Sequence, residues 1–121
     1  MYGGKFLICG GEGQVGTALG RLTPPPGVQF CTFSHSEFDI SNMKKVSEIF
    51  SLVSPCLVIN AASFTDVDEA EDNPDLASLA NKDGPAHLAE ACAKADIPLL
   101  HISADFVFDG TKTTPYTESD P

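Results

Sequence analysis

The chain has 121 residues, of which 42% are hydrophobic and 20% charged, and its formal net charge is −10 at pH 7. This composition is that of an ordinary globular domain, and we expect a single domain over residues 1–121. The negative charge argues against nucleic acid or an anionic membrane surface as a partner. Because the N-terminus has no basic leader and no apolar run approaches the roughly 18 residues of a membrane helix, we expect a cytoplasmic protein.

The first predicted elements are a strand, a glycine turn and a helix between Lys5 and Leu22. An apolar run that ends at Cys9 is typical of a buried strand, and apolar residues recur at helical spacing from Val15 onward. The turn reads Gly10-Gly11-Glu12-Gly13-Gln14-Val15-Gly16. Glycine permits a sharp turn and leaves backbone N–H groups open to a pyrophosphate, which a helix start also attracts. A glycine-rich turn without a ligand is the plainer alternative, since the pattern alone is a weak signal.

Strands and helices alternate along the rest of the chain. A proline-rich break precedes the second strand, Ser41 is expected to cap the second helix, and Gly84-Pro85 is expected to break and restart a later one. The predicted strands cover residues 5–9, 28–33, 56–59 and 98–103. This alternation predicts a Rossmann-like, doubly wound α/β fold with four parallel strands in the order 3-2-1-4. The polar segment 109–121 has no apolar period and is expected to be a loop.

The cysteines, acidic residues and histidines do not predict a metal site. No C-x-x-C pair occurs, and at least two cysteines lie in apolar runs, so buried reduced thiols are expected. The cysteines are Cys9, Cys31, Cys56 and Cys92. The acidic cluster between Asp66 and Asp75 lacks the ligand pattern of a calcium loop and is expected to be a solvated helix start. His101, within an apolar strand, is expected to be a hydrogen-bonded core imidazole.

The end of the second strand bears on which nicotinamide dinucleotide such a domain would take. An acidic residue there commonly bonds the adenine ribose of NAD. Here the strand is followed by Ser34-His35-Ser36, with Glu37 and Asp39 further on. Hydroxyl and imidazole groups at Ser34 and His35 could accommodate a 2′-phosphate, which favours NADP over NAD. Plain loop residues are the equal alternative.

Several motifs resemble those of a known family. They occur in the order Gly10-x-x-Gly13-Gln14-Val15-Gly16, Asn60-Ala61-Ala62-Ser63-Phe64-Thr65-x-Val67-Asp68-x-Ala70-Glu71, Asn81, and Ser103-Ala104-Asp105-Phe106-Val107-Phe108-Asp109-Gly110. With these motifs, the chain from Lys5 to Asp120 resembles the N-terminal, cofactor-binding part of the dTDP-4-dehydrorhamnose reductase family. That family belongs to the extended short-chain dehydrogenase/reductase group. The resemblance implies an oxidoreductase that transfers hydride to the 4-keto group of a dTDP-sugar in dTDP-rhamnose biosynthesis.

The resemblance also implies a set of cofactor-binding residues. The glycines would hold the pyrophosphate, Asp39 and Ile40 would border the adenine, and Ser103 would lie near the nicotinamide. Together with Ser34 and His35, the candidate residues are Gly10, Gly13, Gln14, Val15, Gly16, Asp39, Ile40, Ala61, Ala62, Phe64 and Ser103. The implied cofactor is NADP or NAD.

Two departures from the family pattern concern catalysis. The family has Ser-Thr-Asp-Tyr where this chain has Ser103-Ala104-Asp105-Phe106, so a threonine hydroxyl is absent at Ala104. Ser103 is a poor substitute, because neighbours along a strand point to opposite faces. The family also uses a Tyr-x-x-x-Lys pair, which neither Tyr2 nor Tyr116 forms. We therefore assign no catalytic residue and expect the chain alone to be inactive, with a dTDP-sugar bound only in a longer form.

An alternative is a non-catalytic, NADP-binding interaction protein. The resemblance extends to the same group's regulatory subunit of methionine adenosyltransferase, and Ala104 would suit such a role. In either case the fourth strand would be left as an unpaired sheet edge with apolar neighbours, which predicts association between copies of the chain.

Overall fold

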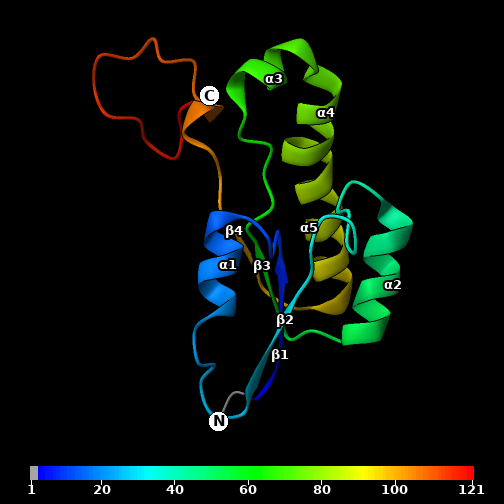
Figure 1. Cartoon of the computed structure of the whole chain (residues 1–121). Helices are drawn as coiled ribbons and strands as arrows, with labels where there is room; N and C mark the ends of the chain where they lie inside the picture. Colours follow the sequence, from blue (N-terminus) through cyan, green and yellow to red (C-terminus); the bar gives the residue numbers. More distant parts are fainter. Residues whose placement is uncertain (1–2) are drawn as a thin grey trace.

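The computed structural model describes residues 3–121, apart from the side chain of Asp105, and Tyr2 lies outside it. Four strands form one parallel sheet (Figure 1). The strands are β1 (Gly4–Cys9), β2 (Val28–Thr32), β3 (Leu57–Asn60) and β4 (Leu99–His101). The predicted Rossmann-like class and the four parallel strands are confirmed.

The predicted strand order 3-2-1-4 is wrong, because the observed order is β2-β1-β3-β4. β3 pairs with β1, with Leu7 opposite Val58, and not with β2. Leu7 and Ile8 of β1 are fully buried, so β1 needs a neighbour on both sides. β2 has no fully buried residue, as expected of an edge strand. The crossover direction therefore reverses between β1 and β3, which makes their carboxyl ends a topological switch point.

Helices cover the two faces of the sheet unequally. α1 (Gln14–Gly20) lies on one face, while α2 (Met43–Val53) and α5 (Gly84–Ala95) pack together on the other (Figure 1). The main core lies on the second face, where Leu7 and Val58 of the sheet meet Leu88 of α5. On the α1 face, Leu100 of β4 remains 56% exposed. This face is thus only partly covered.

The start of α2 differs by one residue from its prediction. Asn42, not Ser41, caps the helix, because its Oδ1 accepts a hydrogen bond from Lys45 N at 3.1 Å. Ser41 instead donates from its amide and its hydroxyl to Asp39 Oδ1, at 2.9 and 2.7 Å. The segment between β2 and α2 is therefore a structured turn whose Phe38 and Ile40 are buried in the core.

A continuous helical rod runs through residues 74–95. It consists of α4 (Pro74–Ser78), a π-helical turn η1 (Leu79–Asp83) and α5, and it follows the short α3 (Val67–Asp72). The predicted break at Gly84-Pro85 is wrong, because Gly84 keeps helical dihedral angles. In an α-helix, a proline ring normally clashes with the carbonyl of the residue four positions earlier. For Pro85 that residue lies within the π turn η1, whose wider backbone accommodates the ring. A Cβ at Gly84 would lie 2.6 Å from Ile40 Cγ1, so close packing explains the glycine.

The acidic cluster forms a helix start, as predicted. Asp66 caps α3, accepting a hydrogen bond from Glu69 N at 3.0 Å. Within residues 3–121, no group of three or more histidine, cysteine or acidic side chains is arranged to hold a metal ion. Within the same residues, no helix has the length and apolarity needed to cross a bilayer.

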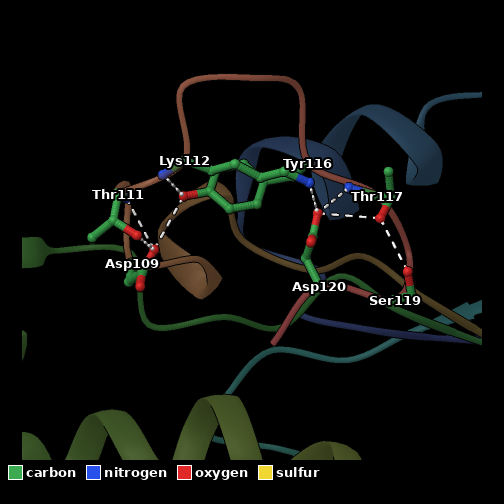
Figure 2. Close-up of polar contacts among 7 residues, drawn as sticks. All are labelled: Asp109, Thr111, Lys112, Tyr116, Thr117, Ser119 and Asp120. Atoms are coloured by element: carbon green, nitrogen blue, oxygen red, sulfur yellow. Dashed lines mark hydrogen bonds and ion pairs between the residues drawn. The ribbon is translucent and has the colours of Figure 1, made fainter.

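The segment after β4 folds on itself. A 3-10 turn, η2 (Asp105–Val107), is followed by residues 109–121, which contain neither helix nor strand. Figure 2 shows Asp109 accepting hydrogen bonds from Thr111 and Tyr116, while Lys112 pairs with Asp120. The Tyr116 ring stacks on Phe108 with centroids 4.2 Å apart. The loop is therefore held by its own contacts.

Two expectations about buried side chains are partly wrong. All four cysteines lie among the described residues and are free thiols, but only Cys9 and Cys92 are buried, and Cys56 is exposed. Cys56 lies directly before β3 and so outside the buried part of that strand. His101 is hydrogen-bonded as expected, to Asn60, but it is exposed and not in the core. β4 is a three-residue edge strand, so only one of its sides is covered.

Candidate functional site

The candidate site lies at the carboxyl ends of β1 and β3, where the crossover direction reverses. Gly10, directly after β1, has a φ of +74°, which glycine adopts at low cost. A Cβ on Gly10 would lie 2.7 Å from Ala62 N, so the two chain segments approach more closely than any side chain would permit. The Ala61 amide donates to Cys9 O at 3.2 Å and fixes this approach.

The glycine turn is packed on one side and open on the other. A Cβ on Gly16 would lie 2.0 Å from Gly10 O, so packing within the turn requires glycine there. A Cβ on Gly13 would lie 3.4 Å from the same oxygen, an ordinary contact. Gly13 has a φ of −72°, which other residues adopt freely. Packing therefore does not explain glycine at position 13, which faces the adjoining hollow.

The main hollow has a volume of about 520 Å³, within the range of small-molecule sites. Its lining combines the glycine turn, the segment after β2, the loop after β3 and the start of the rod. Eight of the predicted cofactor-binding residues line it: Gly10, Gly13, His35, Asp39, Ile40, Ala61, Ala62 and Phe64. Leu76, Leu79 and Ala80 form its apolar wall on the rod.

A second hollow of about 370 Å³ adjoins the first through Ala62, Ser63 and Phe64. It extends toward the end of β4, and Ser103 and Ala104 line it. The two hollows thus form a trough along the carboxyl edge of the sheet.

The other predicted residues lie outside the trough. Gln14, Val15 and Gly16 form the start of α1, where Gly16 is buried and Val15 is 44% exposed. Ser34 lines a separate shallow depression of about 360 Å³ at the end of β2. The predicted set therefore divides into a trough group, a helix-start group and Ser34.

Glu37 lines the same depression as Ser34 and was not among the predicted cofactor-binding residues. Its Oε2 accepts hydrogen bonds from Ser34 N at 2.9 Å and from Ser34 Oγ at 2.8 Å. The hydrogen bond from the Ser34 amide, followed by that from its hydroxyl, lowers the pKa of the Glu37 carboxyl. The available signal was an acidic residue shortly after the second strand, where this fold commonly places one.

Asn81 and Asn60 hold the loop that follows β3. Asn81 binds the Phe64 backbone twice, accepting from its N–H at 2.8 Å and donating to its carbonyl at 2.9 Å. Asn60 is fully buried, and its Oδ1 accepts from Ala62 N at 3.0 Å. Its Nδ2 lies within hydrogen-bond distance of His101 Nδ1, at 3.1 Å. The sequence analysis used both asparagines only as motif positions.

A glycine turn after the central strand, facing a trough at the strand switch point, defines a Rossmann-type α/β domain with its ligand site at the carboxyl ends of the strands. The family model described as the RmlD substrate binding domain matches residues 4–121. The chain therefore belongs to the RmlD family.

Proteins of known function and structure agree with this assignment. The chain is 35% identical over 116 residues to the dTDP-4-dehydrorhamnose reductase of Sinorhizobium fredii, covering 96% of this chain and 39% of that protein. A Clostridium acetobutylicum dTDP-4-dehydrorhamnose reductase structure matches with a TM-score of 0.87 and 36% identity, over 97% of this chain and 42% of the other.

A Bacillus anthracis dTDP-4-dehydrorhamnose reductase, solved in complex with NADP, matches with a TM-score of 0.85 and 30% identity over 93% of this chain and 40% of that one. The chain thus spans about two fifths of the length of the relatives it matches.

Proposed function

We propose that this chain binds a nicotinamide dinucleotide, NADP or NAD, in the trough. The observation that carries the proposal is Gly13, whose missing side chain is not required by packing and leaves open backbone beside the main hollow. The chain has a net charge of −10, so its overall field repels an anionic ligand. Local backbone dipoles, such as those of open N–H groups, can still attract that ligand at the site. The bound relative from Bacillus anthracis supports a dinucleotide of this kind.

The proposed ligand runs along the trough in one direction. The pyrophosphate lies against Gly10 and Gly13, and the adenosine half lies beside Asp39 and Ile40. The nicotinamide half then passes Phe64 toward Ser103. The structured turn before α2 fixes the adenosine end, because Asp39 is held by Ser41 and the Ile40 carbonyl lies 3.1 Å from His87 Nδ1.

We further propose that the chain is the cofactor-binding part of a dTDP-4-dehydrorhamnose reductase. When bound, the nicotinamide would supply hydride to the 4-keto group of a dTDP-sugar. The chain itself holds and orients the dinucleotide. Residues 3–121 offer no tyrosine placed as a general acid, since the Tyr116 hydroxyl donates a hydrogen bond to Asp109 within the tail and no lysine follows it four residues later. On this proposal the chain alone binds cofactor without turnover, in the cytoplasm.

A second candidate is a non-catalytic dinucleotide-binding protein that acts through interaction. The observation that favours it is Ala104, which lines the second hollow without the hydroxyl that the family pattern has there. The two candidates share cofactor binding and differ in the residues after Pro121. A Tyr-x-x-x-Lys pair encoded beyond that residue supports the enzyme, and a stop codon supports the interaction protein.

The open face of β4 supports self-association of the chain. Leu100, Ile102 and Val107 are 56%, 39% and 63% exposed, and β4 is an edge strand. Exposed apolar edges of this kind pair with other chains. We therefore expect dimers or larger species in light scattering at moderate concentration, and a clean monomer would contradict this.

Calorimetric titration of the chain with NADPH, NADH and ATP tests the binding proposal. We expect saturable binding of at least one dinucleotide and weaker binding of ATP. Gly13→Ala is the matched variant, because it keeps the fold and places a methyl group at the hollow; we expect it to lose at least tenfold in affinity. Absence of binding by the unmodified chain, or full affinity in Gly13→Ala, would overturn the proposed site.

A further inference from the structure

The loop that follows β3 separates the two hollows of the trough. Three of its residues line both hollows: Ala62, Ser63 and Phe64. The loop covers residues 61–66, which contain neither helix nor strand, so the regular hydrogen bonds of a sheet or helix do not fix it. Asn60 holds its beginning, and Asp66 at its end caps α3. The position of its middle therefore depends on contacts from elsewhere in the chain.

Asn81 supplies these contacts. Its Oδ1 accepts a hydrogen bond from Phe64 N at 2.8 Å, and its Nδ2 donates to the Phe64 carbonyl at 2.9 Å. The hydroxyl of Ser63 donates to the same Oδ1 at 3.4 Å. Both ends of the side-chain amide thus pair with the backbone of one residue, 17 positions earlier in the chain. Asn81 therefore joins the middle of the loop to the helical rod.

Burial does not require these bonds, because Asn81 is an exposed residue. A buried amide must find its partners inside the protein, whereas an exposed amide can bond water. The exchange of bonds to water for bonds within the protein also contributes little net stability. The pairing of Asn81 with Phe64 is therefore better explained by the position it gives the loop than by the stability it gives the fold.

The rod presents Asn81 at the junction of the two hollows. Asn81 lies in the middle of the π turn η1, a kind of turn that occurs frequently at functional sites. The two residues before it, Leu79 and Ala80, line the main hollow, and Asn81 itself lines the second. Three successive residues of the turn thus border the trough, and the one at the second hollow holds the loop between them.

We propose that Asn81 is a positioning residue that holds the Phe64 segment in place for the nicotinamide half of the dinucleotide. The inference rests on the proposed dinucleotide function, in which the adenosine half lies in the main hollow and the nicotinamide half passes Phe64 into the second. A loop that is already in position need not be ordered when the ligand binds, which lowers the entropy cost of binding. Asn81 therefore raises the affinity for the complete dinucleotide, and the adenosine half gains little from it.

The test uses calorimetry to compare NADH with ADP and NADPH with 2′-phospho-ADP, because the ligands of each pair differ by the nicotinamide riboside. In Asn81→Ala, we expect the affinity for the dinucleotides to fall at least tenfold, about 1.4 kcal/mol. We expect the affinity for the two shorter ligands to change less than about twofold, since the adenosine end of the trough stays intact. A variant that is merely unstable would lose affinity for all four ligands alike.

Asn73→Ala is the matched control, because it makes the same substitution at the start of the rod, where the asparagine side chain forms no capping hydrogen bond. We expect it to leave all affinities unchanged. Asn81→Asp keeps the acceptor for the Phe64 amide and loses the donor to its carbonyl, so it should lose part of the dinucleotide affinity. It carries the test if circular dichroism shows that Asn81→Ala is unfolded.

Two results would overturn the inference and leave the binding site standing. One is full dinucleotide affinity in a folded Asn81 variant, and the other is an equal loss of affinity for the dinucleotides and for the shorter ligands. Failure of the unmodified chain to bind either dinucleotide would instead overturn the proposed function itself.

Discussion

Replacement of Gly16 by alanine should destabilise the fold. The added Cβ would lie 2.0 Å from Gly10 O, 2.7 Å from Gly10 C and 2.9 Å from Gly11 Cα. All three are backbone atoms, so no side chain can rotate away and the turn itself must move. Overpacking of this kind costs about 1–3 kcal/mol.

Two further terms decide the size of the loss. The Gly11 amide bonds the Phe33 carbonyl at 2.9 Å, and moving the turn weakens that bond by about 1 kcal/mol. The higher helix propensity of alanine offsets about 1 kcal/mol. The last two terms cancel, so we expect Gly16→Ala to lose about 1–3 kcal/mol, a sizeable part of the 5–15 kcal/mol of a typical domain.

Urea unfolding monitored by circular dichroism measures this loss as a lower midpoint with an unchanged slope. Gly13→Ala is the matched control, since its Cβ would make only an ordinary contact at 3.4 Å. We expect that variant to lose less than about 1 kcal/mol, the scale of an N-cap change. Gly16→Ala within about 0.5 kcal/mol of the unmodified chain, or an equal loss in both variants, would refute the packing argument.

Three other predictions concern thiols, acid and the loop after β3. With a thiol reagent at mildly alkaline pH, the exposed Cys56 should react at once and Cys9 should react only after unfolding. Cys9 is protected because burial raises its pKa to about 12. Labelling of Cys9 in the folded protein would contradict this prediction. Hydrogen bonds lower the pKa of Asp109 below its usual 3.8. Its contribution to the stability of the tail is therefore fully present above that pH and is lost as the pH falls through the lower pKa of the folded state. The NMR resonances of the stacked Tyr116 ring should shift over that lower pH range, and resonances that stay constant would show that Asp109 does not hold the ring. Asn81→Ala removes the two hydrogen bonds to the Phe64 backbone, of about 1 kcal/mol each, and the weaker one from Ser63 Oγ, so it should speed hydrogen exchange of the Phe64 amide. Unchanged protection of that amide would show that the loop is held otherwise.

Local sequence patterns predicted the elements of this fold well. The apolar run through Leu7 and Cys9 is a buried strand because both faces of β1 are covered, so its residues need no alternation. The glycine spacing placed Gly10 and Gly13 beside the main hollow, because turn geometry depends on nearby residues alone. Ala62, at the end of β3, was predicted from the resemblance to the family, and it lines the main hollow.

Long-range relations were not predictable in this way. The pairing of β3 with β1 depends on which strand is buried on both sides, and no local pattern records it. Gly84 appeared to break a helix, but its missing side chain makes room for Ile40, more than forty residues earlier. His101 is exposed because β4 has a single neighbour.

The π turn at Leu79–Asp83 lets the rod hold an additional residue without turning its two ends relative to each other. A π turn accommodates one residue more than an α turn, whereas an extra residue in a regular α-helix would rotate everything after it by about 100° around the axis. Leu76, in the wall of the hollow, and Leu88, in the core, therefore keep nearly the relative orientation that a regular helix one residue shorter would give them. The wider turn thus keeps the ligand-facing part of the rod aligned with the part that packs on the sheet.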